Sequence, residues 1–192
     1  MKKIMFNDKY GLTEAVLKGR KTQTRRILSD DLLLKYGHNK YNNRSYDLIN
    51  AAPYFIGEII AIAQNYVDAI NCFDKEKTID SILGWGKIIG NTENNCEGYR
   101  NKMFVKAELM PHQIEITDIK VEKLQDISDE DCLKEGIVKL GFLSYSYKDR
   151  PIEKELFRSP QSAFSELIDK VSGKGTWMRN PYVFAYSFKL IK

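Results

Sequence analysis

The chain has 192 residues and a mass of 22.2 kDa, which fits one domain with a sizeable buried core. Its composition, 43% hydrophobic and 29% charged, is that of a soluble globular protein and excludes a disordered chain. The net charge of +4 permits nucleic-acid binding but does not by itself establish it.

The sequence also argues against a membrane protein and a metalloprotein. No apolar run approaches the ~18 residues of a membrane span, and Met1–Lys3 leads into no signal-peptide core. We therefore expect a cytoplasmic protein. The cysteines, Cys72, Cys96 and Cys132, and the histidines, His38 and His112, lack the spacing of metal ligands. We therefore predict no metal and no cofactor. We interpret the cysteines as small apolar side chains that pack in the interior.

A basic segment follows the first predicted helix. Apolar residues at helical spacing predict a helix over Asn7 to Lys18, and Gly19 suits the left-handed residue that ends a helix. The next residues, from Gly19 to Arg26 (GRKTQTRR), contain four cations and three hydrogen-bonding side chains. This composition suits a phosphate-bearing or otherwise polar ligand.

Alternation within this segment divides its side chains between two faces. If Lys21 to Ile27 is a strand, one face carries Lys21, Gln23 and Arg25, and the other carries Thr22, Thr24 and Arg26. Neither face is purely apolar, so we expect the strand to line a cleft.

The first half of the chain otherwise alternates between irregular regions and one clear strand. Residues 28–53 are polar and predict a long irregular segment with a helical turn over 31–36. Gly57 to Ala63 predicts a buried strand. Residues 67–101 predict a long inserted region that contains a helix over 75–83.

In the second half, Met103 to Leu124 predicts extended structure with a bulge near Thr117 and Asp118. Ser128 is a good N-cap for a short helix that Gly136 ends. Glu135 lies at the C-terminal end of this helix, where the helix dipole disfavours a carboxylate, and this position indicates a specific partner.

The last third begins with a further variable region over 139–159. A helix is predicted over Pro160 to Ser172, with Ser159 before it and Gly173 after it. Residues 173–181 predict a loop, and Tyr182 to Leu190 predicts a closing strand. Strands with few helices and long loops indicate a small antiparallel or mixed barrel.

Five segments follow one another along the chain: Gly19-x-Lys21-x-x-x-x-Arg26, Gly57–Ile62, Met110–Pro111, Val121–Ile137 and Asn180–Phe184. In this order they resemble the ASCH domain, a branch of the PUA-like superfamily, and its phage and prophage subgroup in particular. The resemblance implies one domain over 1–192. The implied fold is α+β, a PUA-like small mixed β-barrel with flanking helices and long insertions at about 28–53, 67–101 and 139–159.

The resemblance implies that the protein binds RNA or a modified nucleoside or nucleotide in a basic cleft. Aromatic rings would stack on a base while cations hold phosphate. For Trp177, packing against the core is the stronger alternative. The expected ligand-binding residues are Arg20, Arg25, Arg26, Trp177, Asn180 and Tyr182.

An enzymatic alternative comes from a small branch of the same family that resembles acetylcytidine amidohydrolases. Its catalytic positions match Lys21, Thr24 and Glu135. Thr24 would attack, Lys21 would accept its proton, and Glu135 would protonate the leaving amine. Strand alternation opposes this mechanism, because it places Lys21 and Thr24 on opposite faces.

Two further alternatives stay open. Glu135 can simply form an ion pair with Lys21 or Arg26, and the protein can be a phage-encoded interaction module that uses its inserted regions. The sequence leaves open the oligomeric state and whether the protein is an enzyme.

Overall fold

The computed structural model of the chain describes residues 1–37, 48–71, 101–148 and 151–191. The chain forms two compact units. Unit 1 comprises Met1–Phe6, Ile59–Ile114 and Ile191–Lys192. Unit 2 comprises Asn7–Glu58 and Glu115–Leu190.

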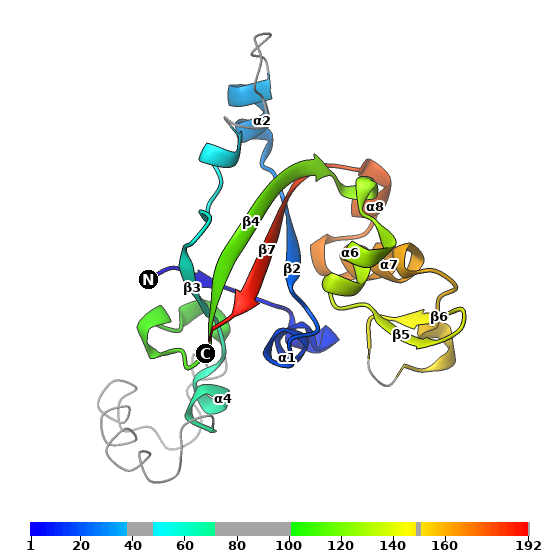
Figure 1. Cartoon of the computed structure of the whole chain (residues 1–192), viewed down its shortest axis with the longest axis horizontal. Coiled ribbons are helices and arrows are strands. Elements are labelled where there is room, and N and C mark those ends of the chain that lie inside the picture. The colour runs from blue at the N-terminus through cyan, green and yellow to red at the C-terminus, as the bar shows by residue number, and fades with distance from the viewer. Residues whose placement is uncertain (38–47, 72–100, 149–150, 192) are drawn as a thin grey trace. The chain divides into compact units, whose positions relative to one another are not determined.

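Five of the described strands form one mixed sheet in the order β1-β3-β4-β7-β2 (Figure 1). β1 pairs with β3 in parallel, and β2 pairs with β7 antiparallel. Within the described residues β1 and β2 are the two ends of this order, and closure of the sheet into a barrel stays a prediction. The α+β class is confirmed. The strands are β1 (Lys3–Ile4), β2 (Gln23–Ile27), β3 (Ile59–Ile62), β4 (Gln113–Lys123) and β7 (Tyr182–Leu190).

Unit 1 is built around the buried strand β3, which the sequence predicts. Its small core consists of Ala61, Ala63, Ala69, Val105, Ala107 and Met110. The predicted extended segment from Met103 is wrong over its first residues, because η2 (Lys102–Phe104) and η3 (Ala107–Leu109) are 3-10 turns. The Lys3 ammonium fixes this region by donating to the carbonyls of Met103 and Val105 at 2.6 and 2.8 Å. A short helix, α4 (Tyr66–Asn71), was not predicted.

Unit 2 begins with a helical segment that a glycine divides. The predicted continuous helix is instead a 3-10 turn, η1 (Asp8–Tyr10), and a helix, α1 (Leu12–Leu17). Gly11 separates them with a φ of 67°, a left-handed conformation that favours glycine. Gly19 has a φ of 71°, as predicted for the end of a helix. The later helix α2 (Asp30–Gly37) is longer than the single turn expected.

The strand β2, which pairs with β7, carries the predicted site residues Thr24, Arg25 and Arg26. Thr24 lies opposite Tyr186, and Arg25 lies opposite Ala185. Because side chains alternate along a strand, Gln23 and Arg25 share one face while Thr24 and Arg26 share the other. The strand begins at Gln23 rather than at Lys21.

Two predicted helices of unit 2 are confirmed. The helix α6 (Asp129–Lys134) begins at Ser128, whose hydroxyl accepts from the Asp131 amide at 3.1 Å. Glu135 follows at its C-cap. The helix α7 (Pro160–Ser172) begins at Ser159 and packs its apolar side into the core.

Two regions without predicted elements are ordered in this unit. Part of the 139–159 region forms a hairpin, β5 (Val138–Gly141) and β6 (Ser144–Ser146), followed by the 3-10 turn η5 (Glu153–Glu155). The predicted loop over 173–181 is wrong, because it contains the helix α8 (Thr176–Arg179). The Asp169 carboxylate holds this turn by accepting from the amides of Gly175 and Trp177 at 2.9 and 2.8 Å.

Three smaller predictions concern the bulge in β4, the cysteines and membrane-spanning segments. In β4 the burial pattern slips between Ile116 and Ile119, where the bulge is predicted. Cys132 is buried as expected, but the other two cysteines and the helix over 75–83 lie outside the described residues. None of the described helices has the length and apolar character needed to cross a membrane.

Candidate functional site

The predicted partners Lys21 and Glu135 are in direct contact. The Lys21 ammonium lies 2.5 Å from Oε2 of Glu135 and donates to its backbone carbonyl at 2.8 Å. Their side chains are only 3% and 6% exposed. The contact exists because Glu135 ends α6 at the point where the chain enters β2, and the backbone amide of Thr22 donates to the Lys134 carbonyl at 2.8 Å.

Arg25 extends this contact into a buried ionic cluster on the same face of β2. Its guanidinium donates to Glu135 at 3.1 Å, to Asp131 at 3.3 Å and to Glu122 from Nε at 2.9 Å. The Arg25 side chain is 1% exposed, so these three carboxylates replace its hydration. Gln23 accepts a weaker bond from Arg25 at 3.4 Å.

The charges of this cluster balance. Three carboxylates surround Lys21 and Arg25, and the exposed Lys134 adds a third cation by binding Asp131 at 2.9 Å. Burial lowers the pKa of Lys21 below its ordinary value, and the attraction of Glu135 opposes that shift. Burial raises the pKa of Asp131, but Lys134 and Arg25 outweigh it and hold that pKa below its ordinary value.

The cluster is therefore a structural link as the protein stands. It ties α6 to β2 and leaves its charged groups saturated by one another. A substrate would have to displace one of these ion pairs to reach Lys21.

Thr24 and Arg26 lie on the opposite face of β2. Thr24 is buried and lies across from Tyr186, whose ring packs against Tyr54 at 5.4 Å between ring centroids. The structure thus brings together two of the three predicted catalytic residues, Lys21 and Glu135, and leaves Thr24 on the other side of the strand.

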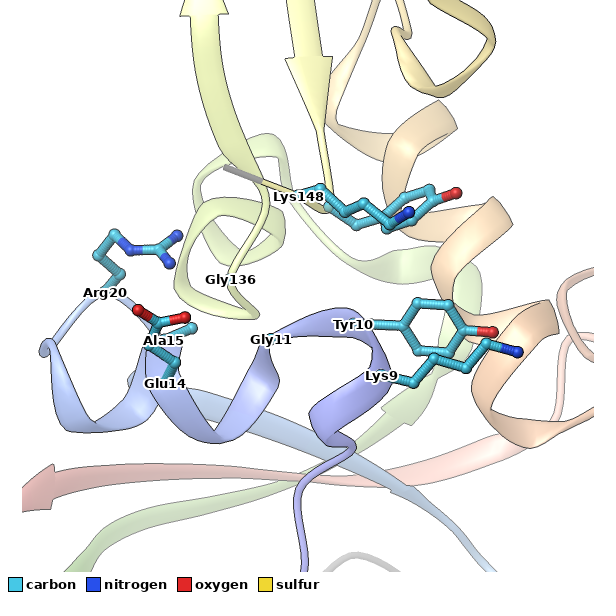
Figure 2. Close-up of a pocket in the computed structure, with 9 residues that line it drawn as sticks. Lys9, Tyr10, Gly11, Glu14, Ala15, Arg20, Gly136 and Lys148 are labelled. Atoms are coloured by element: carbon cyan, nitrogen blue, oxygen red, sulfur yellow. The ribbon is translucent and has the colours of Figure 1, made fainter. Parts of the chain in front are cut away.

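A small pocket, here called the Arg20 pocket, has a volume of ≈ 120 Å³ (Figure 2). Gly136 in its lining is close to the ionic cluster, since a Cβ at this glycine would lie 3.6 Å from Cβ of Lys21. Of the predicted ligand-binding residues, only Arg20 lines this pocket. Its lining consists of Lys9, Tyr10, Gly11, Glu14, Ala15, Arg20, Gly136, Tyr147 and Lys148.

A larger pocket, here called the Tyr182 pocket, has a volume of ≈ 470 Å³. Two predicted ligand-binding residues, Asn180 and Tyr182, line it. Lys123 lies over the Tyr182 ring, with its ammonium 3.9 Å from the ring centroid. The other lining residues are Ile27, Leu28, Ser29, Asp30, Leu33, Arg179 and Pro181.

The remaining predicted ligand-binding residues do not line either pocket. Trp177 packs edge-on against Phe164, with ring centroids 6.2 Å apart, which agrees with the packing alternative. Arg25 is held in the buried cluster, and Arg26 lies on the Thr24 face.

Sequence reasoning missed several cations that line the pockets. Lys123 lies inside the segment that resembles the ASCH family, and Arg179 directly precedes Asn180, so proximity to predicted residues was an available signal. Lys9 and Lys148 had no such signal, because they are distant in sequence and the fold brings both to the Arg20 pocket.

Comparison with protein-family models, with curated proteins and with solved structures found no match to this chain.

Proposed function

We propose that the protein binds RNA or a nucleotide-like ligand in the Tyr182 pocket. The observation that carries this proposal is the combination of an exposed aromatic ring with two cations, Lys123 and Arg179, around a pocket of ≈ 470 Å³. Pockets of about 300–1,000 Å³ accommodate small ligands and cofactors.

The chemistry of the lining suits a nucleotide. Tyr182 is 40% exposed, and its ring offers a surface on which a base can stack. Such stacking is worth about 1–3 kcal/mol per base. Lys123 and Arg179 supply positive charge for a phosphate group. The Arg179 guanidinium donates from Nη2 to the Thr176 hydroxyl at 3.0 Å, and this contact holds the end of the side chain.

The proposal extends to the fold family. A cytoplasmic ASCH-type protein with a PUA-like barrel is supported by the mixed sheet with flanking helices and by the contact of Lys21 with Glu135. The predicted basic cleft is then the Tyr182 pocket rather than the surroundings of Lys21, because the cations beside Lys21 are already neutralised.

Fluorescence anisotropy with labelled single-stranded RNA tests the proposal. We expect Lys123→Ala and Arg179→Ala each to weaken binding by about 10- to 150-fold, since a charge-assisted contact is worth about 1.5–3 kcal/mol. Loss of one phosphate contact also reduces the salt slope by about 0.7 for a single strand. Tyr182→Ala removes stacking and weakens binding with little change in salt slope.

Lys120→Ala is the matched control. Lys120 lies on the same strand as Lys123, is exposed, and lies 4.0 Å from Asp118, away from the pocket lining. Equal losses in Lys120→Ala and Lys123→Ala, or no RNA binding by the unmodified protein, would overturn the proposal.

A second candidate function is hydrolysis of acetylated cytidine. It is favoured by the contact of Lys21 with Glu135 and by the burial that lowers the Lys21 pKa. It ranks second because β2 must rearrange before Thr24 reaches Lys21. Incubation with acetylcytidine and chromatography of the products tests it, and turnover that Lys21→Ala abolishes would establish the enzyme. Absence of turnover excludes it.

A further inference from the structure

We propose that the Tyr182 pocket selects guanine and that the Asp30 carboxylate is the group that recognises this base. The inference rests on the proposed function, the binding of RNA or a nucleotide-like ligand in the same pocket, and it names the base that the ligand carries. The pocket belongs to unit 2, and among the described residues that line it Asp30 has the one carboxylate.

Asp30 and Lys123 reach the pocket from opposite sides of β7. The sheet order β4-β7-β2 places β7, which begins at Tyr182, between the other two strands. Lys123 is the last residue of β4, and the chain reaches Asp30 three residues after β2 ends. There the Leu28 amide donates to the Tyr182 carbonyl at 2.9 Å, which holds the segment before Asp30 against the start of β7.

The segment that carries Arg179 is anchored to the end of β4. The backbone amide of Gln125 donates to Oδ1 of Asn180 at 2.9 Å, and its side-chain amide donates to the Trp177 carbonyl at 2.8 Å. The Lys123 ammonium adds a longer bond to the Asn180 carbonyl at 3.4 Å. The two cations of the pocket therefore come from the β4 side, and the carboxylate comes from the β2 side.

This separation of charge matches the two ends of a nucleotide. A phosphate group is attracted by Lys123 and Arg179 and repelled by Asp30, so the charges direct it to the β4 side and the base to the β2 side. The Lys123 ammonium lies 3.9 Å from the centroid of the Tyr182 ring and covers one of its faces. At most one face is left for stacking, so the pocket takes a single base.

The Asp30 side chain is available to a ligand. It is exposed, and within the part of the chain that the structure describes its carboxylate takes part in no hydrogen bond or ion pair, although Lys123 and Arg179 line the same pocket. An ionised carboxylate accepts hydrogen bonds and donates none. The ligand must therefore present donors to the β2 side of the pocket.

Guanine is the base whose edge best satisfies a carboxylate. Its N1–H and N2–H donors are adjacent, so they can form two parallel bonds to one carboxylate. Adenine and cytosine carry a ring-nitrogen acceptor beside their amino group, and uracil carries carbonyl acceptors on both sides of its N–H. These three bases would direct an acceptor at Asp30, so the site rejects them by repulsion as well as by the loss of a bond.

Fluorescence anisotropy with labelled single-stranded RNAs tests the inference. The strands are short runs of uridine that differ only at a central residue, which is guanosine, inosine, adenosine or uridine. We expect the guanosine strand to bind about 5- to 150-fold more tightly than the adenosine and uridine strands, the range for one bidentate base contact. Inosine lacks only the N2 amino group, so its strand should lose part of this preference.

Asp30→Asn should weaken binding of the guanosine strand and abolish its preference over the other strands. The sign of this change is diagnostic, because removal of a negative charge would by itself strengthen binding to RNA. Asp31→Asn is the matched control. Asp31 is also exposed in the first turn of α2 but does not line the pocket, so this variant should keep the preference for guanosine.

Competition by guanosine monophosphate distinguishes two sources of the base. Displacement of the guanosine strand identifies the free nucleotide as an accepted ligand, and a lack of displacement restricts the site to guanosine within RNA.

Equal affinity for the guanosine, adenosine and uridine strands would overturn the guanine inference, as would an unchanged preference in Asp30→Asn. If binding of the strands still weakens in Lys123→Ala, the RNA-binding proposal stands without it. Binding of neither the strands nor guanosine monophosphate by the unmodified protein would overturn both proposals.

Discussion

Replacing Glu135 by glutamine should destabilise the protein strongly, because this carboxylate compensates two buried cations at once. Lys21 would lose its 2.5 Å partner and Arg25 would lose one of its three carboxylates. The glutamine side chain has nearly the same volume, so the change removes charge without opening a cavity.

The expected magnitude follows from the burial of the partners. Removing one member of a buried ion pair costs about 3–5 kcal/mol, because the remaining charge stays desolvated. For a chain of this size each kcal/mol lowers Tm by about 2–4 °C, so Tm should fall by roughly 6–20 °C. The loss is a large fraction of a typical total stability of about 5–15 kcal/mol.

Urea unfolding followed by circular dichroism measures this loss, with Glu166→Gln as the matched control. Glu166 pairs with Lys170 on the exposed side of α7, so its replacement should cost less than about 1 kcal/mol. Adding Lys21→Met to Glu135→Gln should recover part of the stability, since it removes the uncompensated ammonium. A loss below about 1 kcal/mol, or no recovery in the double variant, would refute the structural role assigned to the cluster.

Three further predictions concern unit 2. The backbone amides of Trp177 and Gly175 hold the pKa of Asp169 below its ordinary 3.8. The ionised carboxylate therefore stabilises the folded protein fully above that pH, and this contribution disappears as pH falls through the lower folded-state pKa. Asp169→Asn should lower the free energy of unfolding at pH 7 by about 1 kcal/mol and make stability fall less steeply in acid. Burial raises the pKa of the Cys132 thiol to about 12, so in a Cys72→Ser, Cys96→Ser variant Ellman's reagent should react only after unfolding, and rapid native labelling would contradict this. Ser128→Ala should cost about 1 kcal/mol in urea unfolding by removing the α6 cap, and Ser128→Asp should restore most of it.

Local sequence signals located much of unit 2 because they act over a few residues. Ser128 and Gly136 define α6 through a side-chain cap and a left-handed backbone, and neither depends on distant contacts. The same holds for the alternation of β2, which correctly separated Thr24 from the face of Gln23 and Arg25. It also supplied the physical objection to the hydrolase, which the geometry supports.

Other local predictions failed where a side chain outside the segment decides its conformation. The loop predicted over 173–181 contains α8, because the Asp169 carboxylate accepts the amides that begin this turn. Glycine-rich sequence predicts a loop when that acceptor is not considered. Closure of the sheet into a barrel also depends on contacts between strands far apart in the sequence. Because β1 and β2 lie at the two ends of the order β1-β3-β4-β7-β2, closure stays a proposal.

The sequence by itself determined that a carboxylate at the end of α6 has a partner in the basic segment, and it named Lys21 among the partners. Only the tertiary structure decided that Arg25 joins them, that the cluster is neutral and buried, and that Lys123 and Arg179 line the Tyr182 pocket. The reason is physical: alternation and capping fix the direction of a side chain, whereas its charge is available to a ligand only if no other part of the fold neutralises it.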